Sequence, residues 1–167
     1  MAGKTDFTAD EWKTLLESVM MAALAVTAAD PSGLWGTLKE SMATAKTVIG
    51  AKHDASATEL IKALAGEFET GEGRAAARDG LRTQLSGKTP AEIVSKSLEI
   101  LKQAAALVSA KSPSDAAAFK GWLQHISQSV AEAASEGGFL GFGGVQVSDA
   151  EKATPLQSVR TERSGAA

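Results

Sequence analysis

Apolar residues recur at helical spacing along most of the chain, in runs that short polar segments separate. One run extends from about Ala9 to Ala29: its first half keeps the apolar positions on one face, and its second half is apolar nearly all round. A helix with one apolar stripe packs on a core, and a helix that is apolar on all sides is usually central. We therefore expect the 9–29 helix to lie at the centre of the fold. The alternative is that it ends in a lipid- or partner-facing surface.

Further runs predict helices at 31–52, from Ser56 to about 70, at 74–85, at 90–111 and at 113–136. The short 74–85 helix follows Thr70-Gly71-Glu72-Gly73, which we interpret as a helix breaker. The 90–111 helix has the widest apolar face: Ile93, Ile100 and Leu107 widen a stripe formed by Val94, Leu98, Leu101, Ala105 and Val108. So wide a face predicts packing against at least two neighbours.

Capping boxes mark the helix starts. In this motif a Ser or Thr at the N-cap accepts a hydrogen bond from the N–H three residues on, and a Glu there reaches back to the N-cap N–H. The form recurs at Thr8–Glu11, Ser56–Glu59, Thr89–Glu92, Ser112–Asp115 and Ser148–Glu151, the fourth with Asp in place of Glu. Several boxes at helix-sized intervals, each followed by an apolar run, indicate an all-α protein.

The character of the chain changes after residue 136. Residues 137–144 hold five glycines and three large apolar residues, and residues 145–147 alternate like an extended segment. A short final helix is expected from Ser148 until Pro155 ends or kinks it. The sequence thus predicts a Gly/Phe-rich loop between the main helices and a short C-terminal helix.

Together these elements predict a single-domain antiparallel helical bundle of about five main helices over residues 1–153. Residues 154–167 are expected to form a flexible tail. The chain has 167 residues, of which 44% are apolar and 22% charged. A chain of this length buries roughly two thirds of its unfolded surface, which is enough for a real core.

Composition narrows the classes of function. The chain has no cysteine, which excludes disulfides, thiolate catalysis and cysteine metal sites. Its net charge of −3 argues against general nucleic-acid binding. The first ten residues carry no hydrophobic signal core, and the longest strongly apolar stretch, 19–29, is shorter than the ~20 residues of a membrane span. We expect a cytoplasmic protein without a transmembrane segment, and contact with a membrane surface stays open.

The glycine-aromatic segment that follows residue 138 is the strongest candidate for an interaction site. Gly141 and Gly143 free the backbone for close approach, while Phe139, Leu140 and Phe142 supply large apolar side chains. These side chains either dock into a partner, a lipid surface or a second copy, or fold back and plug the open end of the bundle. The glycine order does not match a phosphate-binding loop.

Two other groups of residues suggest binding sites. Arg74, Arg78 and Arg82 recur every four residues and share one helix face, which predicts either an anion patch or a solvated surface. A ligand pocket inside the bundle would be lined by adaptable methionines and tryptophans, at Met20, Met21, Trp35, Met42 and Trp122. The alternative is that the tryptophans simply pack in the hydrophobic core.

His125 is the one candidate for catalysis. It falls on the same helix side as Glu132 and Glu136, and a His–Glu pair can move protons or bind metal. The same combination also describes an ordinary polar flank. No nucleophile elbow occurs, and neither histidine has a Glu three residues before it, as a di-metal bundle requires. We expect no metal and no cofactor.

Three hypotheses for function result. The first is a non-enzymatic interaction or structural protein that associates with itself or another protein through Phe139–Phe142. The second is a bundle that binds a small molecule or lipid in an internal pocket. The third is an enzyme that uses His125 with Glu132 or Glu136. The first leads, because the chain lacks a convergent catalytic set, and a bundle fold by itself transfers no function.

Overall fold

A computed structural model describes the backbone of residues 2–29 and 35–139, and it describes the side chains in these ranges except at 29, 35–43 and 134–139. Six α-helices make up this part of the chain: α1 (Ala9–Ala29), α2 (Trp35–His53), α3 (Glu59–Glu67), α4 (Gly71–Leu85), α5 (Pro90–Lys111) and α6 (Pro113–Phe139). A short 3₁₀ turn at Lys4–Asp6 precedes them, and the described residues contain no strand. The expected all-α fold is confirmed. The extended segment, the C-terminal helix with its capping box at Ser148, and the tail lie outside the described residues.

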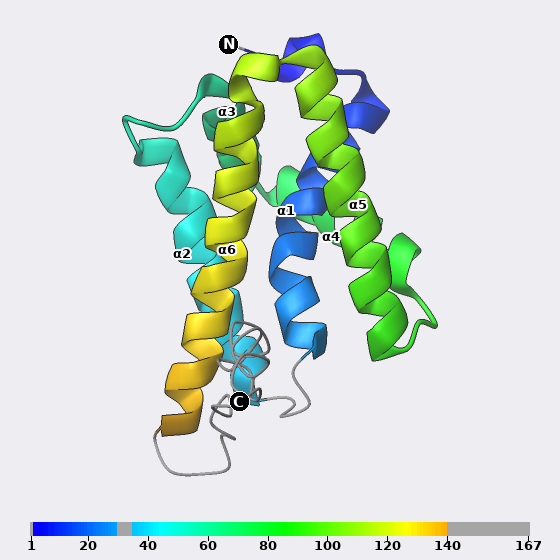
Figure 1. Ribbon diagram of the computed structural model, residues 1–167, viewed down its shortest axis with the longest axis vertical. Helices are drawn as coiled ribbons and strands as arrows, with labels where there is room; N and C mark the ends of the chain where they lie inside the picture. The colour runs from blue at the N-terminus through cyan, green and yellow to red at the C-terminus, as the bar shows by residue number, and fades with distance from the viewer. Residues whose placement is uncertain (1, 30–34, 140–167) are drawn as a thin grey trace, which may run out of the picture.

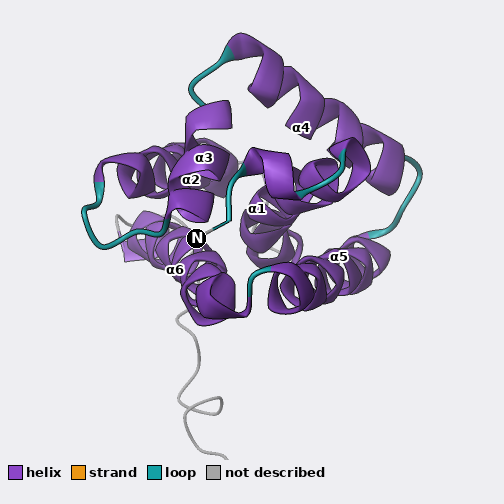
Figure 2. Ribbon diagram, turned by 90° about the horizontal axis from the view of Figure 1, so that it is seen from above, coloured by secondary structure: helices purple, strands orange, loops and turns teal. Residues whose placement is uncertain are grey.

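α1 is the central helix of the fold, as its apolar pattern predicts. It contacts α2, α4, α5 and α6, and its most extensive interface is with α5. Along the long axis, α1 and α6 run in one direction and α2 and α5 in the other (Figure 1). Seen along that axis, α1 lies among the other helices, with α4 lying across one side (Figure 2). The four long helices form an antiparallel bundle, and α3 and α4 cover part of it.

The core lies where α1 meets its neighbours. Its largest fully buried apolar side chains include Leu15, Val19, Leu60, Leu64, Val108, Phe119 and Ile126. Burying one such side chain contributes about 1.5–3 kcal/mol. α1 is buried on all sides over residues 15–19, which include the polar Glu17 and Ser18, whereas Leu24 and Val26 in its apolar second half are half-buried.

α4 packs on α1 through a face of small residues, formed by Gly73, Ala77 and Gly80. A Cβ atom at Gly80 would lie 2.3 Å from Oε1 of Glu17, so the glycine lets the two helices approach over this carboxylate. Glu17 is only 4% exposed, and its Oε1 accepts no hydrogen bond from the described residues. Lys13 Nζ lies 3.8 Å from the same oxygen. α4 is therefore held by close approach of its backbone, because it has no large apolar side chain buried against α1.

Two of the predicted helices have the expected bounds, and their capping boxes are formed. At α1, the Thr8 N–H donates to Glu11 Oε2 at 2.7 Å, and the Glu11 N–H donates to Thr8 Oγ1 at 3.3 Å. At α5, the Thr89 N–H donates to Glu92 Oε2 at 2.8 Å, and the Glu92 N–H returns to Thr89 Oγ1 at 3.4 Å. At these two helix starts the sequence motif and the structure agree.

The predicted box at Ser56 is wrong. The N–H and Oγ of Ser56 both donate to Asp54 Oδ1, at 2.8 and 2.6 Å, and Thr58 is the N-cap of α3. Thr58 Oγ1 accepts from the Ile61 N–H at 3.4 Å. Asp and Ser side chains compete for nearby backbone groups, and here the preceding Asp captures the serine.

The break expected at residues 70–73 is also misplaced. α3 already ends at Glu67, and α4 begins at Gly71, so both glycines of this stretch lie in the first turn of a helix. Thr70 is the N-cap and accepts from the Gly73 N–H at 2.9 Å. At the other end of the described chain, α6 runs to Phe139, three residues beyond the expected Glu136, because glycine costs a helix only about 1 kcal/mol.

The predicted box at Ser112 does not form, because the Asp115 N–H donates to the Ser112 carbonyl at 3.0 Å and not to the Ser112 hydroxyl. The Ser112 N–H donates to the Val108 carbonyl at 2.8 Å, because Ser112 also caps the end of α5. The Asp115 carboxylate therefore accepts instead from Ser112 Oγ at 2.6 Å and from the Ala2 N–H at 3.0 Å. Burial alone would raise the pKa of this buried carboxyl, but the two hydrogen bonds outweigh it and hold the pKa below its ordinary value.

The apolar stripe of α5 is turned relative to the expectation. The buried positions are Ser97, Ile100, Ala104 and Val108. Leu98, in the predicted stripe, is 47% exposed. The buried serine is accommodated because its Oγ donates to the sulfur of Met21 in α1, at 3.3 Å. α5 does contact more than one neighbour, namely α1, α6 and α4.

Candidate functional site

A groove of about 500 Å³ lies between α2 and α6. These helices lie side by side in both views of the fold (Figures 1 and 2). The α2 wall consists of Lys46, Thr47, Gly50, Ala51 and Asp54, and the α6 wall consists of Trp122, His125, Ser129, Glu132 and Ala133. In both sets the residues recur at intervals of three to four, so each wall is one helix face.

Small residues line the middle of the groove. A Cβ atom added at Gly50 would meet no atom within 4 Å, although Gly50 lies inside a helix. A helical glycine is about 0.5–1 kcal/mol less favourable than alanine. No packing contact of the described residues explains the glycine at this position. Its effect is to open the groove down to the backbone of α2.

Trp122 gives the groove its aromatic side. The residue is 7% exposed, and its ring packs against Phe119 with a centroid distance of 6.5 Å and an interplanar angle of 56°. Its indole Nε1 is buried and donates no hydrogen bond to any described group. The ring is therefore fixed by the core on one side and borders the groove on the other.

The carboxylates and one hydroxyl of the groove already have hydrogen-bond partners. Asp54 accepts from the hydroxyl and the N–H of Ser56, and these two bonds hold the pKa of Asp54 below its ordinary value. Glu132 Oε1 accepts from Gln128 Nε2 at 2.8 Å, and Ser129 Oγ donates to the His125 carbonyl at 2.9 Å.

Three donors in the groove are unused. The side chains of Lys46, Thr47 and His125 make no hydrogen bond or ion pair with another described residue. Lys46 and His125 are exposed, and Thr47 is half-buried. The groove therefore offers donors on these three side chains and acceptors on the exposed carboxylates of Asp54 and Glu132.

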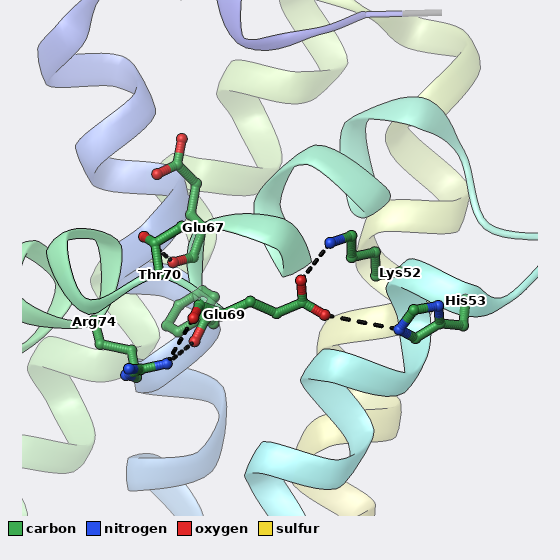
Figure 3. A network of polar contacts seen from close by, with 7 residues as sticks. Lys52, His53, Glu67, Glu69, Thr70 and Arg74 are labelled. Atoms are coloured by element: carbon green, nitrogen blue, oxygen red, sulfur yellow. Dashed lines mark hydrogen bonds and ion pairs between the residues drawn. The ribbon is translucent and has the colours of Figure 1, made fainter.

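A polar network fixes the C-terminal end of α2 beside the groove (Figure 3). Glu69 forms an ion pair with Lys52, and its Oε1 lies 3.7 Å from His53 Nε2. The hydrogen bond from Lys52 is the main reason that the pKa of Glu69 is lowered. Arg74 Nη1 donates to the carbonyls of Phe68 and Glu69, both at 2.9 Å. The network ties α2 to the corner between α3 and α4.

The predicted arginine patch is thus partly engaged inside the protein. One arginine of the three, Arg74, satisfies carbonyls at the end of α3. Arg78 and Arg82 are exposed on α4. An anion patch at these two positions stays a prediction.

The predicted pocket residues do not gather in one place. Trp122 lines the groove, whereas Met21 is fully buried against Ser97 of α5 and Met20 packs at the edge of the core. The side chains of Trp35 and Met42 lie outside the described residues. The groove between α2 and α6 is therefore not the internal pocket that the sequence analysis predicts.

His125 and Glu132, the proposed catalytic pair, both line the groove. The side chain of Glu136 lies outside the described residues. So does the proposed interaction segment: the backbone of Phe139 ends α6, but its side chain and all of Leu140, Gly141, Phe142 and Gly143 lie outside the described part.

The α2 wall is absent from the sequence-based candidates. Its residues carry no motif, and only Gly50, a helical glycine in an otherwise regular apolar pattern, signals it. The spacing of Trp122 and His125 places them on one face of their helix, but no local pattern shows that α2 lies opposite.

The described residues contain no group of three or more His, Asp or Glu side chains that would hold a metal ion, and no helix among them is long and apolar enough to cross a membrane. No protein-family model, curated protein or solved structure matches the chain. The function is therefore inferred from the groove itself.

Proposed function

We propose that this protein is a non-enzymatic binding protein that holds a small organic molecule in the α2–α6 groove. The observation that carries the proposal is the groove itself, whose volume of about 500 Å³ lies within the roughly 300–1,000 Å³ of typical ligand sites. Such sites combine an apolar or aromatic lining with a few polar groups, and this groove is lined by Trp122 together with Lys46, Thr47 and His125.

Binding is favoured over catalysis by the surroundings of His125. A general base or nucleophile is normally oriented by a second group that hydrogen-bonds to it. No hydrogen bond to the His125 imidazole occurs among the described residues. The side chain is exposed, so nothing described holds the ring in one orientation.

A ligand screen with a blocked groove tests the proposal. A fragment library would be screened by ligand-observed NMR against the native protein, Gly50→Phe and Gly66→Phe. Gly66 is a matched control, because it is a helical glycine of α3 with no atom within 4 Å of its Cβ position and no part in the groove. We expect fragments that bind the native protein and Gly66→Phe but not Gly50→Phe, with helical circular dichroism unchanged. Binding that survives in Gly50→Phe, or no binding at all, would contradict the proposal.

We propose, second, self-association through Phe139, Leu140 and Phe142, which is supported by the sequence alone, where these large apolar residues stand among five glycines at 137–144. Light scattering on the native protein and on a Phe139→Ser/Phe142→Ser variant tests it. An oligomer that becomes a folded monomer supports the proposal. A native monomer, or a variant that keeps the native mass, overturns it.

The proposal includes a cytoplasmic location, and small molecules or copies of this chain as partners rather than nucleic acid. A chain without cysteine is compatible with a reducing compartment, and a net charge of −3 gives no general attraction for phosphate backbones. Cell fractionation at native expression level tests the location.

A further inference from the structure

We propose that the α2–α6 groove selects flat aromatic molecules that carry one ammonium group: the ammonium group binds to Asp54 at one end of the groove, and the aromatic body lies over Gly50. This inference rests on the proposed function and adds the chemical class of the ligand. It follows from the order of the charged side chains along the groove and from the open space beside Gly50.

The charged side chains divide unequally between the two ends of the groove. Because α2 and α6 run in opposite directions, the early residues of α2 lie opposite the late residues of α6 (Figure 1). Among the lining residues, Lys46 and Glu132 therefore share one end, where one positive and one negative charge compensate each other. Asp54 lies at the other end, together with Trp122 and His125. The lining holds no lysine or arginine at that end, so the uncompensated negative charge of the groove lies at Asp54.

The Asp54 carboxylate is ionised and has acceptor positions left for a ligand. Both hydrogen bonds from Ser56 go to its Oδ1, and they hold the pKa of Asp54 below its ordinary value. The side chain is exposed, and its Oδ2 can accept from an ammonium group in a charge-assisted hydrogen bond. The positive charge of Lys62 also acts on Asp54, but Lys62 Nζ forms an ion pair with Glu59 Oε1 at 3.2 Å. Asp54 therefore favours a cation over an anion or a neutral group.

The opposite end of the groove sets the length and the second polar group of the ligand. Lys46 and Asp54 are eight residues apart, which is about 12 Å along a helix. An ammonium group at Asp54 therefore stays well away from the Lys46 ammonium. A carboxamide at the far end of the ligand suits Lys46 and Glu132, because it has a carbonyl that accepts and N–H groups that donate.

Between the two ends, the groove has a surface suited to a flat ring. Gly50, Ala51 and Ala133 project little into the groove, and a Cβ atom at Gly50 would meet nothing within 4 Å. Trp122 borders the groove with an indole that packs against Phe119. An aromatic ring can approach the α2 backbone at Gly50 and pack offset or edge-on against the indole. A thicker saturated body would gain less from such a surface.

A matched set of three probes tests the charge preference. The probes 6-(aminomethyl)-2-naphthamide, naphthalene-2,6-dicarboxamide and 6-carbamoyl-2-naphthoate share one ring system and one carboxamide, and they carry a positive, no and a negative charge. Each would be titrated into ¹⁵N-labelled native protein while the indole N–H signal of Trp122, assigned with Trp122→Phe, is followed by NMR. We expect the ammonium compound to bind about fivefold more tightly than the diamide, as one exposed ion pair allows, and the carboxylate to bind most weakly.

A fourth probe tests the flat body. In 6-(aminomethyl)decalin-2-carboxamide the two rings are saturated, while both polar groups are kept. We expect it to bind about threefold less tightly than the naphthalene compound with the same groups, because it loses the aromatic contact with Trp122.

Two aspartate variants test the placement of the ammonium group. Asp54→Asn should weaken binding of the ammonium compound about fivefold and leave the diamide unchanged, because asparagine removes the charge but keeps a carbonyl that accepts from Ser56. Asp79→Asn is the matched control, because Asp79 is an exposed aspartate of α4 outside the groove and its loss changes the net charge equally. This control should bind all probes as the native protein does.

The outcomes separate the two proposals. If the diamide or the carboxylate binds as tightly as the ammonium compound, the preference for a cation is overturned and the groove remains a binding site. If the ammonium compound binds best but Asp54→Asn has no effect, the assigned carboxylate is wrong. If the saturated compound binds as tightly as its aromatic counterpart, the preference for a flat ring is wrong. If no probe moves the Trp122 signal and no fragment binds in the wider screen, both proposals fail.

Discussion

The α1–α4 interface and the α2–α6 groove both have a glycine inside a helix, but the two glycines have opposite surroundings. At Gly80, a Cβ atom would lie 2.3 Å from the Glu17 carboxylate, whereas at Gly50 it would meet nothing within 4 Å. Gly80 serves packing, because it lets α4 cover α1. Gly50 serves no packing contact that is described, and a helix loses stability by keeping it. A helical glycine therefore points to a binding site only where the protein itself does not fill the space beside it.

The largest effect is expected at Gly73, at the start of α4. A Cβ atom there would lie 2.1 Å from the carbonyl oxygen of Glu67 and 2.9 Å from Thr70 Oγ1, so Gly73→Ala forces backbone to move and disrupts the Thr70 cap. We expect a loss of about 3 kcal/mol in the free energy of unfolding, at the upper end for an overpacked site. Urea denaturation followed by circular dichroism measures it. Unchanged stability would show that α4 is not packed at this corner as described.

A smaller effect on the free energy of unfolding is expected at Gly80, and its sign should depend on whether Glu17 is present. Gly80→Ala should destabilise the native protein by about 1–2 kcal/mol, because the new methyl group meets the buried Glu17 side chain. In a Glu17→Ala background the same change should stabilise the protein by up to about 1 kcal/mol, as alanine normally does in a helix.

A double-mutant cycle over these four proteins gives the coupling between the two positions. The control is Gly71→Ala, in the same helix, where a Cβ atom meets nothing within 4 Å. Equal effects of Gly80→Ala in both backgrounds would mean that Glu17 and Gly80 are not in contact.

The two buried carboxylates, Glu17 and Asp115, differ in the hydrogen bonds that they accept. Unlike Glu17, Asp115 accepts two hydrogen bonds, and Asp115→Asn should cost about 1–2 kcal/mol at neutral pH. Because the folded-state pKa of Asp115 lies below the ordinary value, its ionised form stabilises the protein above a pH of about 4, and this contribution is lost as the pH falls through the folded-state pKa. Unfolding measured between pH 7 and pH 3 should show the difference between native protein and variant shrinking at the acid end. A difference that grows on acidification would refute the assignment.

The smallest effect is expected at Gly50. Gly50→Ala should stabilise the protein by about 0.5–1 kcal/mol, because the methyl group enters open space and the helix gains propensity. The same variant should bind groove ligands less well. Thermal unfolding should show a higher stability for this variant, and ligand-observed NMR should show weaker binding of the fragments. A destabilised Gly50→Ala would remove the contrast with Gly80.

The sequence predicts the helices of this fold far better than it predicts the groove. Capping boxes such as Thr8–Glu11 and Thr89–Glu92 are local, so the bounds of α1 and α5 can be read from the residues themselves. A helix start is predicted wrongly where two local motifs compete, as at Ser56, whose N–H and hydroxyl both donate to Asp54.

The α6 wall of the groove could be predicted from the spacing of its residues in the sequence, because Trp122, His125 and Glu132 share one helix face. The α2 wall was not, because a helix face reveals its partner only once the packing of the whole bundle is known. The turned face of α5 has the same origin. A buried serine looks unfavourable in sequence, and only the nearby sulfur of Met21 makes it acceptable.

The central position of α1 also has a consequence for how the protein is made. α1 is synthesised early, but its most extensive interface is with α5, whose last residue is Lys111. At the usual rate of translation, the interval between the two helices is on the order of ten seconds. During that time the side chains of Leu15, Leu16 and Val19, which the finished fold buries, lack the cover that α5 gives to α1. We therefore expect α1 to stay incompletely packed on the nascent chain until α5 has been made.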